Sequence, residues 1–155
     1  MTRPASAWPL AVILGLALGG FYLATEQVAA PWVVAGPSME PTLLHGDRVL
    51  VDRWSYRHRP PAAGEVVLVV GPGELPLVKR VVEPLPRALG SPERRWAVAG
   101  DNTAESADSR QFGALTTDRF LGRVVVRYWP PGRIGRLPSR DGPLAGDGVV
   151  NRRWN

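Results

Sequence analysis

A serine and a lysine are the residues of this 155-residue chain whose types could support nucleophilic chemistry. Ser38 lies in the stretch GPSMEPTL, residues 36–43, and serine beside proline by itself predicts a turn. Lys79 is the single lysine among 19 basic residues. Arginine does not deprotonate in proteins, so Lys79 is a candidate for a role that arginine cannot fill. The alternative is an ordinary lysine that serves no chemistry.

A polar loop is the third candidate element. Residues 100–113, GDNTAESADSRQFG, are dense in side chains that donate and accept hydrogen bonds. Such a composition is typical of a surface loop with Asx and serine turns. It is equally suited to hold hydroxyl groups and an ion pair in fixed positions. The acidic spacing of a calcium-binding loop is absent.

Strands must position these residues, because short β-like runs broken by Gly, Pro and Asp follow residue 31. In the run 75–83, Lys79 shares one face with Leu77 and Val81 by the two-residue period. Burial there would lower the pKa of the lysine amine, although a lysine can also extend its charged end to water. The predicted strands are 32–36, 47–53, 65–70, 75–83, 95–100 and 119–129. We therefore expect a mostly β, compact antiparallel domain.

An apolar segment precedes these strands. Residues 4–25 carry no charge, and residues 8–24 are almost entirely apolar. About twenty apolar residues span a bilayer as one helix. A cleavable export signal is the alternative, since small residues end at Ala30, but Pro31 follows directly and disfavours cleavage there. We expect a retained single transmembrane helix with the N-terminus in the cytoplasm.

Four segments follow from this organisation. We predict a short cytoplasmic N-terminus at 1–7, a transmembrane anchor at 8–30, a β domain at 31–129, and a flexible tail at 130–155 that is rich in Gly, Pro and Arg.

Composition excludes several classes of site. The chain has no cysteine, hence no disulfide framework, thiolate nucleophile or Cys-based metal site, and a count of only two histidines argues against a His-rich metal site. The net charge of +5 favours anionic surfaces. The basic residues are scattered, which argues against a dedicated nucleic-acid-binding stripe.

Four stretches occur in a recognisable order after the apolar segment, namely 36–43, 46–52 (GDRVLVD), 77–82 (LVKRVV) and 100–113. Together they resemble the four blocks of the bacterial type I signal peptidases, membrane-bound Ser–Lys endopeptidases. The resemblance covers roughly residues 8–129. It implies a mostly β catalytic domain of the signal-peptidase type behind one membrane anchor.

The resemblance also implies roles for individual residues. Ser38 would be the nucleophile, and its backbone N–H would be one oxyanion donor. Lys79 would be the general base, as in other Ser–Lys pairs. The orienting and supporting residues would be Ser106, which hydrogen-bonds Lys79, and the ion pairs Asp101 with Arg80 and Asp108 with Arg110. Some members carry a serine two residues before the nucleophile as a second oxyanion donor, whereas this chain has Gly36.

By the same resemblance the chain would remove signal peptides with small residues at positions −1 and −3 from exported preproteins. It would need no metal and no cofactor. Its partners would be these preproteins and the lipid bilayer, without nucleic acid, and we expect a monomer. The catalytic domain would lie on the outer face of the cytoplasmic membrane.

Other functions remain open from the residues. A Ser-His-Asp hydrolase would need His45 or His58, and no G-x-S-x-G elbow surrounds Ser38. Self-cleaving repressor-type proteins share the Ser–Lys pair but carry a helical DNA-binding domain, which the sequence does not show. The third alternative is a non-catalytic, membrane-tethered β domain that binds anionic lipid or a protein partner.

Overall fold

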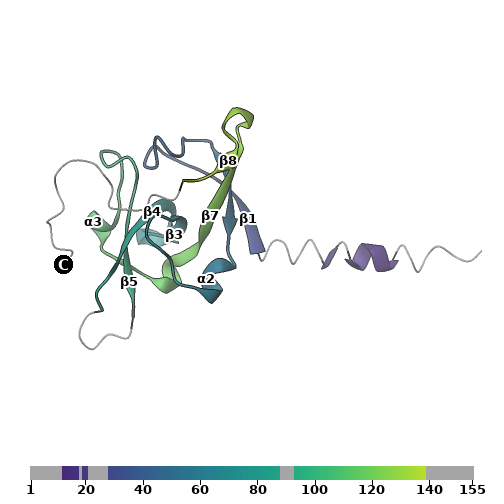
Figure 1. Ribbon diagram of the computed structural model, residues 1–155, viewed down its shortest axis with the longest axis horizontal. Coiled ribbons are helices and arrows are strands. Elements are labelled where there is room, and N and C mark those ends of the chain that lie inside the picture. Colours follow the sequence, from purple (N-terminus) through teal and green to yellow (C-terminus); the bar gives the residue numbers. More distant parts are fainter. Residues whose placement is uncertain (1–11, 18, 21–27, 88–92, 139–155) are drawn as a thin grey trace, which may run out of the picture.

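Eight strands form one antiparallel sheet in the computed structural model, which describes residues 12–17, 19–20, 28–87 and 93–138 (Figure 1). The order is β1-β2-β7-β3-β4-β5-β6, and β8 pairs with β7. The strands are β1 (Ala29–Val33), β2 (Arg48–Asp52), β3 (Val66–Val70), β4 (Pro76–Leu85), β5 (Arg95–Ala99), β6 (Leu115–Thr116), β7 (Phe120–Trp129) and β8 (Gly135–Arg136).

Short helical turns connect the strands. Two four-residue helices, α2 (Ser55–His58) and α3 (Ser109–Phe112), follow β2 and β5. The 3-10 turns are η1 (Pro72–Glu74), η2 (Thr117–Arg119) and η3 (Pro131–Arg133). Every strand pair is antiparallel, so the mostly β antiparallel prediction is confirmed.

All six predicted strands are present, with shifted ends. The first begins at Ala29 rather than at residue 32, because its earlier residues also pair with β2. Strands β6 and β8 and the two short helices were not predicted. Each is too short to show a two-residue or a 3.6-residue period in the sequence.

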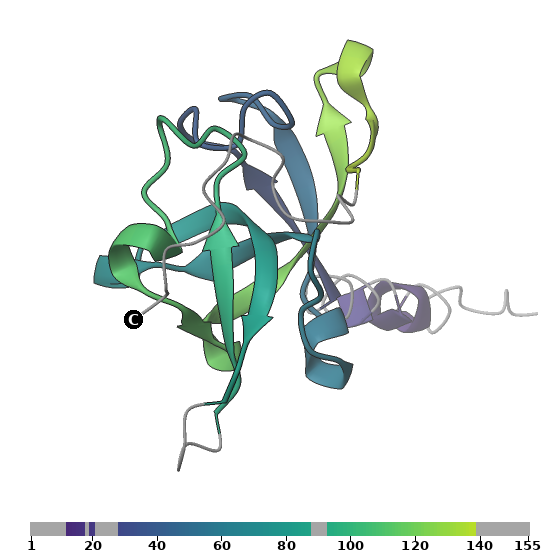
Figure 2. The same ribbon diagram turned by 60° about the vertical axis from the view of Figure 1, so that its left-hand side comes forward.

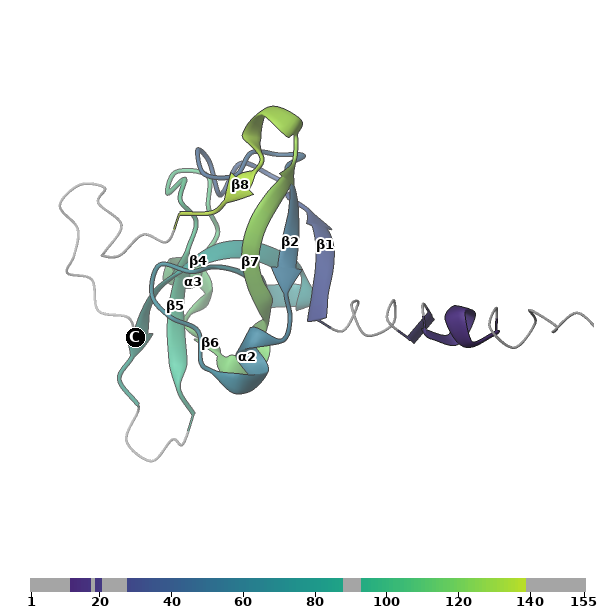
Figure 3. The same ribbon diagram turned by 45° about the vertical axis from the view of Figure 1, so that its right-hand side comes forward.

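The sheet has apolar side chains on both faces, which is why its central strands read as continuous valine runs. In β3, Val66 and Leu68 belong to one buried cluster, whereas Val67 and Val69 belong to the other. The long strand β7 lies between β2 and β3 and so joins the two halves of the sheet (Figures 2 and 3). The middle of β4, residues 78–81, is therefore buried between the two faces.

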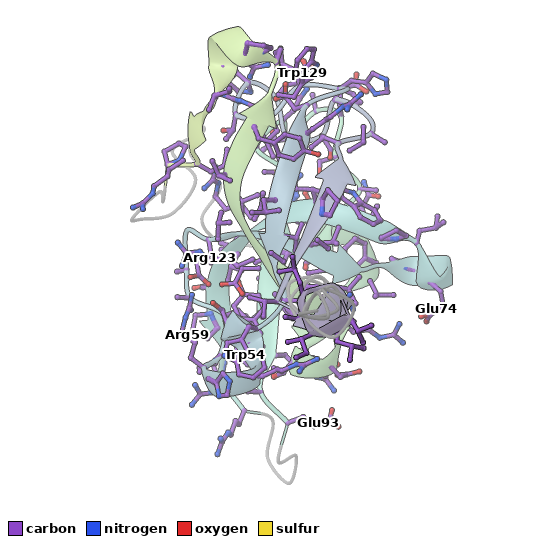
Figure 4. The ribbon with its side chains drawn as sticks, turned by 90° about the vertical axis from the view of Figure 1, so that its right-hand side faces the viewer. Trp54, Arg59, Glu74, Glu93, Arg123 and Trp129 are labelled. Atoms are coloured by element: carbon purple, nitrogen blue, oxygen red, sulfur yellow. The ribbon has the colours of Figure 1, made fainter. Side chains whose placement is uncertain are left out.

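A polar cluster lies where α2 approaches β3 and β7. Glu65 accepts hydrogen bonds from Tyr56 (2.9 Å) and Arg59, and Arg123 of β7 lies 3.6 Å from the same carboxylate. Figure 4 shows the labelled Arg59 and Arg123 side chains converging on this edge of the domain. These contacts fix the loop between β2 and β3 against the sheet.

The predicted anchor at 8–30 lies largely outside the described residues. Residues 12–17 are helical, and Val12, Ile13, Leu14 and Leu16 are exposed. Among the residues that the structure describes, no helix is long and apolar enough to cross a membrane.

The residues that follow β7 pack on the domain. Arg133 of η3 donates to Asp47 (3.2 Å), and β8 pairs with β7. The carbonyl of Pro138 accepts from Arg80 at 3.0 Å. The predicted tail at 130–155 thus begins inside a packed region, and its residues 139–155 lie outside the described part of the chain.

Truncation should separate these two parts of the C-terminal segment. A chain ending after Trp129 loses β8 and the contacts to Asp47 and Arg80, and hydrogen bonds to charged groups stabilise by about 1.5–3 kcal/mol each. We expect its melting temperature to fall by roughly 5–10 °C. A chain ending after Pro138 should melt within about 2 °C of the full chain. Calorimetry of both truncations checks this, and equal melting of the two would show that residues 130–138 add no stability.

Candidate active site

Ser38 lies at the start of the turn that connects β1 to β2. The turn is fixed by two buried apolar side chains, Met39 and Leu43, and by a hydrogen bond of 2.9 Å from the Leu43 N–H to the Met39 carbonyl. Ser38 itself is half-buried. The neighbouring methionine therefore anchors the loop in the core, while the serine stays at its surface.

Asp47 ties this loop to the rest of the sheet. Its buried carboxylate accepts from the Leu44 N–H at 2.9 Å and from the guanidinium groups of Arg127 (3.4 Å) and Arg133 (3.2 Å). Arg127 also donates to the Thr42 carbonyl at 2.8 Å. Asp47, from the stretch 46–52, thus provides a structural carboxylate that stabilises the loop of residues 36–43.

Lys79 lies in the middle of β4, opposite Val67 of β3. Its side chain is 2 % exposed, on the face that carries Val81 and Val69. The predicted apolar environment of this lysine is thus present. Its Nζ donates to the Ser106 Oγ at 2.9 Å. Ser106, which is also buried, comes from the loop between β5 and α3.

The pKa of Lys79 lies below the usual lysine value. Burial away from water is the main cause, the negative charge of Asp108 opposes it, and the positive charge of Arg110 adds to it. Among the described residues, no carboxylate lies within ion-pair distance of the Lys79 amine. The amine therefore has a hydroxyl partner and no opposite charge in contact.

Asp108 is occupied by Arg110 of the same loop. Arg110 Nε and Nη2 donate to the two carboxylate oxygens at 2.8 and 2.7 Å, and the Gly100 N–H donates to Asp108 at 3.3 Å. Burial would raise the pKa of Asp108, but the hydrogen bonds from Arg110 and Gly100 lower it below the usual value. Asp108 therefore stays ionised, and its bonds to Gly100 and Arg110 hold the two ends of the polar loop together beside Lys79.

Arg80 points to the opposite face of β4 from Lys79 and is held by Asp101. Its Nε and Nη2 donate to the two Asp101 oxygens, each at 2.7 Å, and both side chains are almost completely buried. Arg80 also donates to the carbonyls of Gly64 (2.7 Å) and Pro138 (3.0 Å) and contacts Thr42 Oγ1 at 3.5 Å. One arginine thereby connects four separate segments around the candidate site.

Gly100 is the point where the serine loop and the polar loop meet. A Cβ atom at this position would lie 2.3 Å from both the Ser106 Oγ and the Ser38 carbonyl oxygen. The Asn102 N–H donates to the same Ser38 carbonyl at 3.1 Å. Only a residue without a side chain allows this approach, so Gly100 brings Ser38 next to the hydroxyl that holds Lys79.

The structure thus brings Lys79 to Ser106, Asp108 to Arg110 and Arg80 to Asp101. Ser38 lies beside this group through its carbonyl at Gly100 and Asn102, and within the described part of the chain its side chain makes no direct hydrogen bond to the Lys79 amine.

Three further residues contribute in roles that the sequence did not predict, and His45 among them was considered only as the base of a Ser-His-Asp hydrolase. Asp47 fixes the serine loop, Ser109 Oγ accepts from the Val98 N–H at 2.9 Å, and His45 Nδ1 accepts from the Gly36 N–H at 3.1 Å. A polar residue in or beside one of the four blocks was the only available signal for each of them.

The two histidines occupy different environments. His45 bonds a backbone amide of the serine loop, whereas His58 lies on α2 with its ring 4.7 Å from that of Trp54. Among the described residues, no group of three or more His, Cys, Asp or Glu side chains could hold a metal ion. The site thus offers the Ser38 hydroxyl and the desolvated Lys79 amine, two groups suited to nucleophilic attack with general base catalysis.

Comparisons with known proteins identify the family of the chain. The sequence profile of the family "Signal peptidase, peptidase S26" matches residues 7–86 and 85–129. Signal peptidase I of Leptolyngbya laminosa is 29 % identical, over 83 % of this chain and 79 % of the relative. Probable signal peptidase I-2 of Synechocystis is also 29 % identical, over 82 % and 72 %.

A mycobacterial relative has a higher identity. Probable signal peptidase I of Mycobacterium leprae is 36 % identical over 234 aligned positions, which cover 88 % of this chain and 81 % of the relative. Because the alignment is longer than this 155-residue chain, the relative carries inserted residues. The chain therefore belongs to the signal peptidase family, peptidase S26, and is a serine peptidase.

Proposed function

We propose that this chain removes N-terminal signal peptides from exported preproteins, with Ser38 as nucleophile and Lys79 as general base. The observation that carries the proposal is the buried Lys79 amine, bonded to the Ser106 hydroxyl at 2.9 Å beside the Ser38 loop. A lysine in this environment has a larger neutral fraction near neutral pH than a lysine in water. The names of the relatives, signal peptidase I, support the substrate class.

The chemistry follows from these assignments. Neutral Lys79 takes the Ser38 hydroxyl proton as Oγ attacks the carbonyl at position −1 of the preprotein. The Ser38 N–H stabilises the developing oxyanion. Collapse breaks the C–N bond, and the protonated Lys79 returns its proton to the leaving amine. Lys79 then deprotonates a water that attacks the acyl carbonyl, the bond from the acyl carbon to the Ser38 Oγ breaks, and Lys79 returns the proton to this oxygen.

The remaining site residues position these two groups. Ser106 orients the Lys79 amine, and the pair of Asp108 with Arg110 closes the loop that carries Ser106. The pair of Asp101 with Arg80 stabilises the opposite side of β4. None of these four charged residues needs to react.

The substrate segment would bind in an extended conformation and add to the sheet as a further strand. Strand β1 lies at the edge of the sheet that the described residues form and leads directly into the Ser38 loop, so this edge suits such pairing. Small side chains at positions −1 and −3 are the preference that we assign to the pockets. We further propose that the enzyme acts as a monomer.

We assign the apolar residues that precede β1, within the predicted anchor 8–30, to a single transmembrane helix with residues 1–7 in the cytoplasm. Ala29 and Ala30 pair with β2 and so belong to the catalytic domain. This domain, with the packed extension to Pro138, would then lie on the outer face of the cytoplasmic membrane. The exposed apolar side chains of residues 12–16 support this assignment, since bilayer lipids would cover them.

Substitution of Lys79 by arginine tests the base. The change keeps the positive charge but removes the amine that can lose its proton, so cleavage of a preprotein should fall by about 10²–10⁴-fold. Ser38→Ala should fall at least as far, because it removes the nucleophile. Detergent-purified variants assayed for release of mature protein give the measurement. Full activity of Lys79→Arg would refute the assignment of Lys79 as the base.

Two serines of one loop provide a matched pair. Ser106→Ala removes the hydrogen bond to Lys79 and should lower kcat by about 10–100-fold, the loss expected for a hydrogen bond to a charged group. Ser109→Ala removes a buried bond to the Val98 N–H and should lower stability, while the folded enzyme keeps a kcat within about twofold of the original. Equal kcat losses in the two variants would indicate a general effect on packing.

The pH dependence follows from the lowered pKa of Lys79. Only the neutral amine accepts a proton, so kcat/KM should rise with pH and then reach a plateau. The midpoint of the rise should lie below the pKa of ~10.4 of a free lysine. Arg110→Gln removes a positive charge near Lys79 and frees the Asp108 carboxylate, and both changes favour the charged amine. The midpoint should therefore move to higher pH in this variant. A pH–rate profile whose midpoint does not move with Arg110→Gln would argue for another base.

A further inference from the structure

His45 contacts the serine loop through a single hydrogen bond with a defined direction. Its Nδ1 accepts from the Gly36 N–H at 3.1 Å. A neutral imidazole accepts at one ring nitrogen and donates at the other, so the proton of His45 belongs on Nε2. This residue was weighed above only as the base of a Ser-His-Asp hydrolase, a role for which the fold shows no partner carboxylate at ion-pair distance within the described chain.

The bond continues the ladder between β1 and β2 by one step. Val34 donates to the Asp47 carbonyl and accepts from the Gly46 N–H, each at 2.9 Å. Alternate residues of a strand direct their backbone groups to the same neighbour, so the Gly36 N–H also points toward the β2 side. The chain turns away at Gly46, which has a φ of +85°, and the His45 ring supplies the acceptor there.

The position of this bond matters because Gly36 is two residues before Ser38. The intervening Pro37 has a fixed φ, so few soft dihedral angles separate the tethered amide from the serine. On the other side, the Ser38 carbonyl is held by the Asn102 N–H at 3.1 Å. The serine is thus held from both directions along the chain.

We infer that His45 is a positioning residue for the cleavage reaction: its imidazole fixes Gly36 and thereby the orientation of the Ser38 hydroxyl and N–H. This inference rests on the proposed function for its kinetic consequence, although the hydrogen bond itself can be tested without it. His45 does not exchange a proton with the substrate. It also stiffens the end of β1, where the proposed substrate strand would pair.

Paired substitutions test the role. His45→Leu removes the acceptor from an exposed side chain and should leave folding intact, while kcat for preprotein cleavage falls about tenfold with KM nearly unchanged. His45→Asn places an amide oxygen near the Nδ1 position and should restore kcat to within about threefold of the original. His58→Leu changes the only other histidine, on α2, and should have no effect.

Each outcome decides the assignment. Undiminished activity of His45→Leu would overturn it, and so would a His45→Asn variant as slow as His45→Leu, since a general base is not replaced by an amide. Amide hydrogen exchange of Gly36 in the full chain gives a readout independent of catalysis. We expect faster exchange in His45→Leu and preserved protection in His45→Asn, even if the original chain cleaves no preprotein. Unchanged exchange in His45→Leu would show that the bond is not formed in solution.

Discussion

Two adjacent basic side chains are buried on opposite faces of one strand, and this constraint organises the site. Side chains alternate along a strand, so Lys79 and Arg80 of β4 cannot share a partner. Both are only 2 % exposed. A buried charge is costly unless it is paired and hydrogen-bonded. The protein meets this requirement fully at Arg80 and only partly at Lys79.

The difference between the two cations separates structure from chemistry. Arg80 has donors enough for both Asp101 oxygens and for the carbonyls of Gly64 and Pro138, so it connects β4 to three other segments. Lys79 receives a hydroxyl in place of a carboxylate, and its pKa falls because burial is not compensated. An arginine at position 79 would place a permanent charge where no carboxylate is in contact. A lysine at position 80 would match the two Asp101 oxygens poorly, because it lacks the planar fork of donors of a guanidinium group.

The sequence was informative wherever a local pattern determines the outcome. Valine runs predicted the six main strands, and the two-residue period placed Lys79 beside Leu77 and Val81 on an apolar face. The resemblance supplied the ion pairs of Asp101 and Asp108, which no spacing rule would give. The contact of Arg127 with Thr42 joins residues 85 positions apart, and it depends on a register that no local pattern reveals. The packed residues 131–138 were missed for the same reason, since their core partner, Asp47, lies in a distant loop.

The two proposed reacting groups are held with different rigidity. Lys79 lies in a central strand, where both neighbouring strands fix its backbone, whereas Ser38 lies in a half-buried turn. The precision of the serine must therefore come from separate contacts: Met39 in the core, Asp47 at the end of the loop, Asn102 at the Ser38 carbonyl and His45 at Gly36. The last two involve exposed or half-exposed groups that add little to global stability. Loss of such a contact shifts the nucleophile without unfolding the domain, so turnover should be more sensitive than melting temperature to changes in this loop.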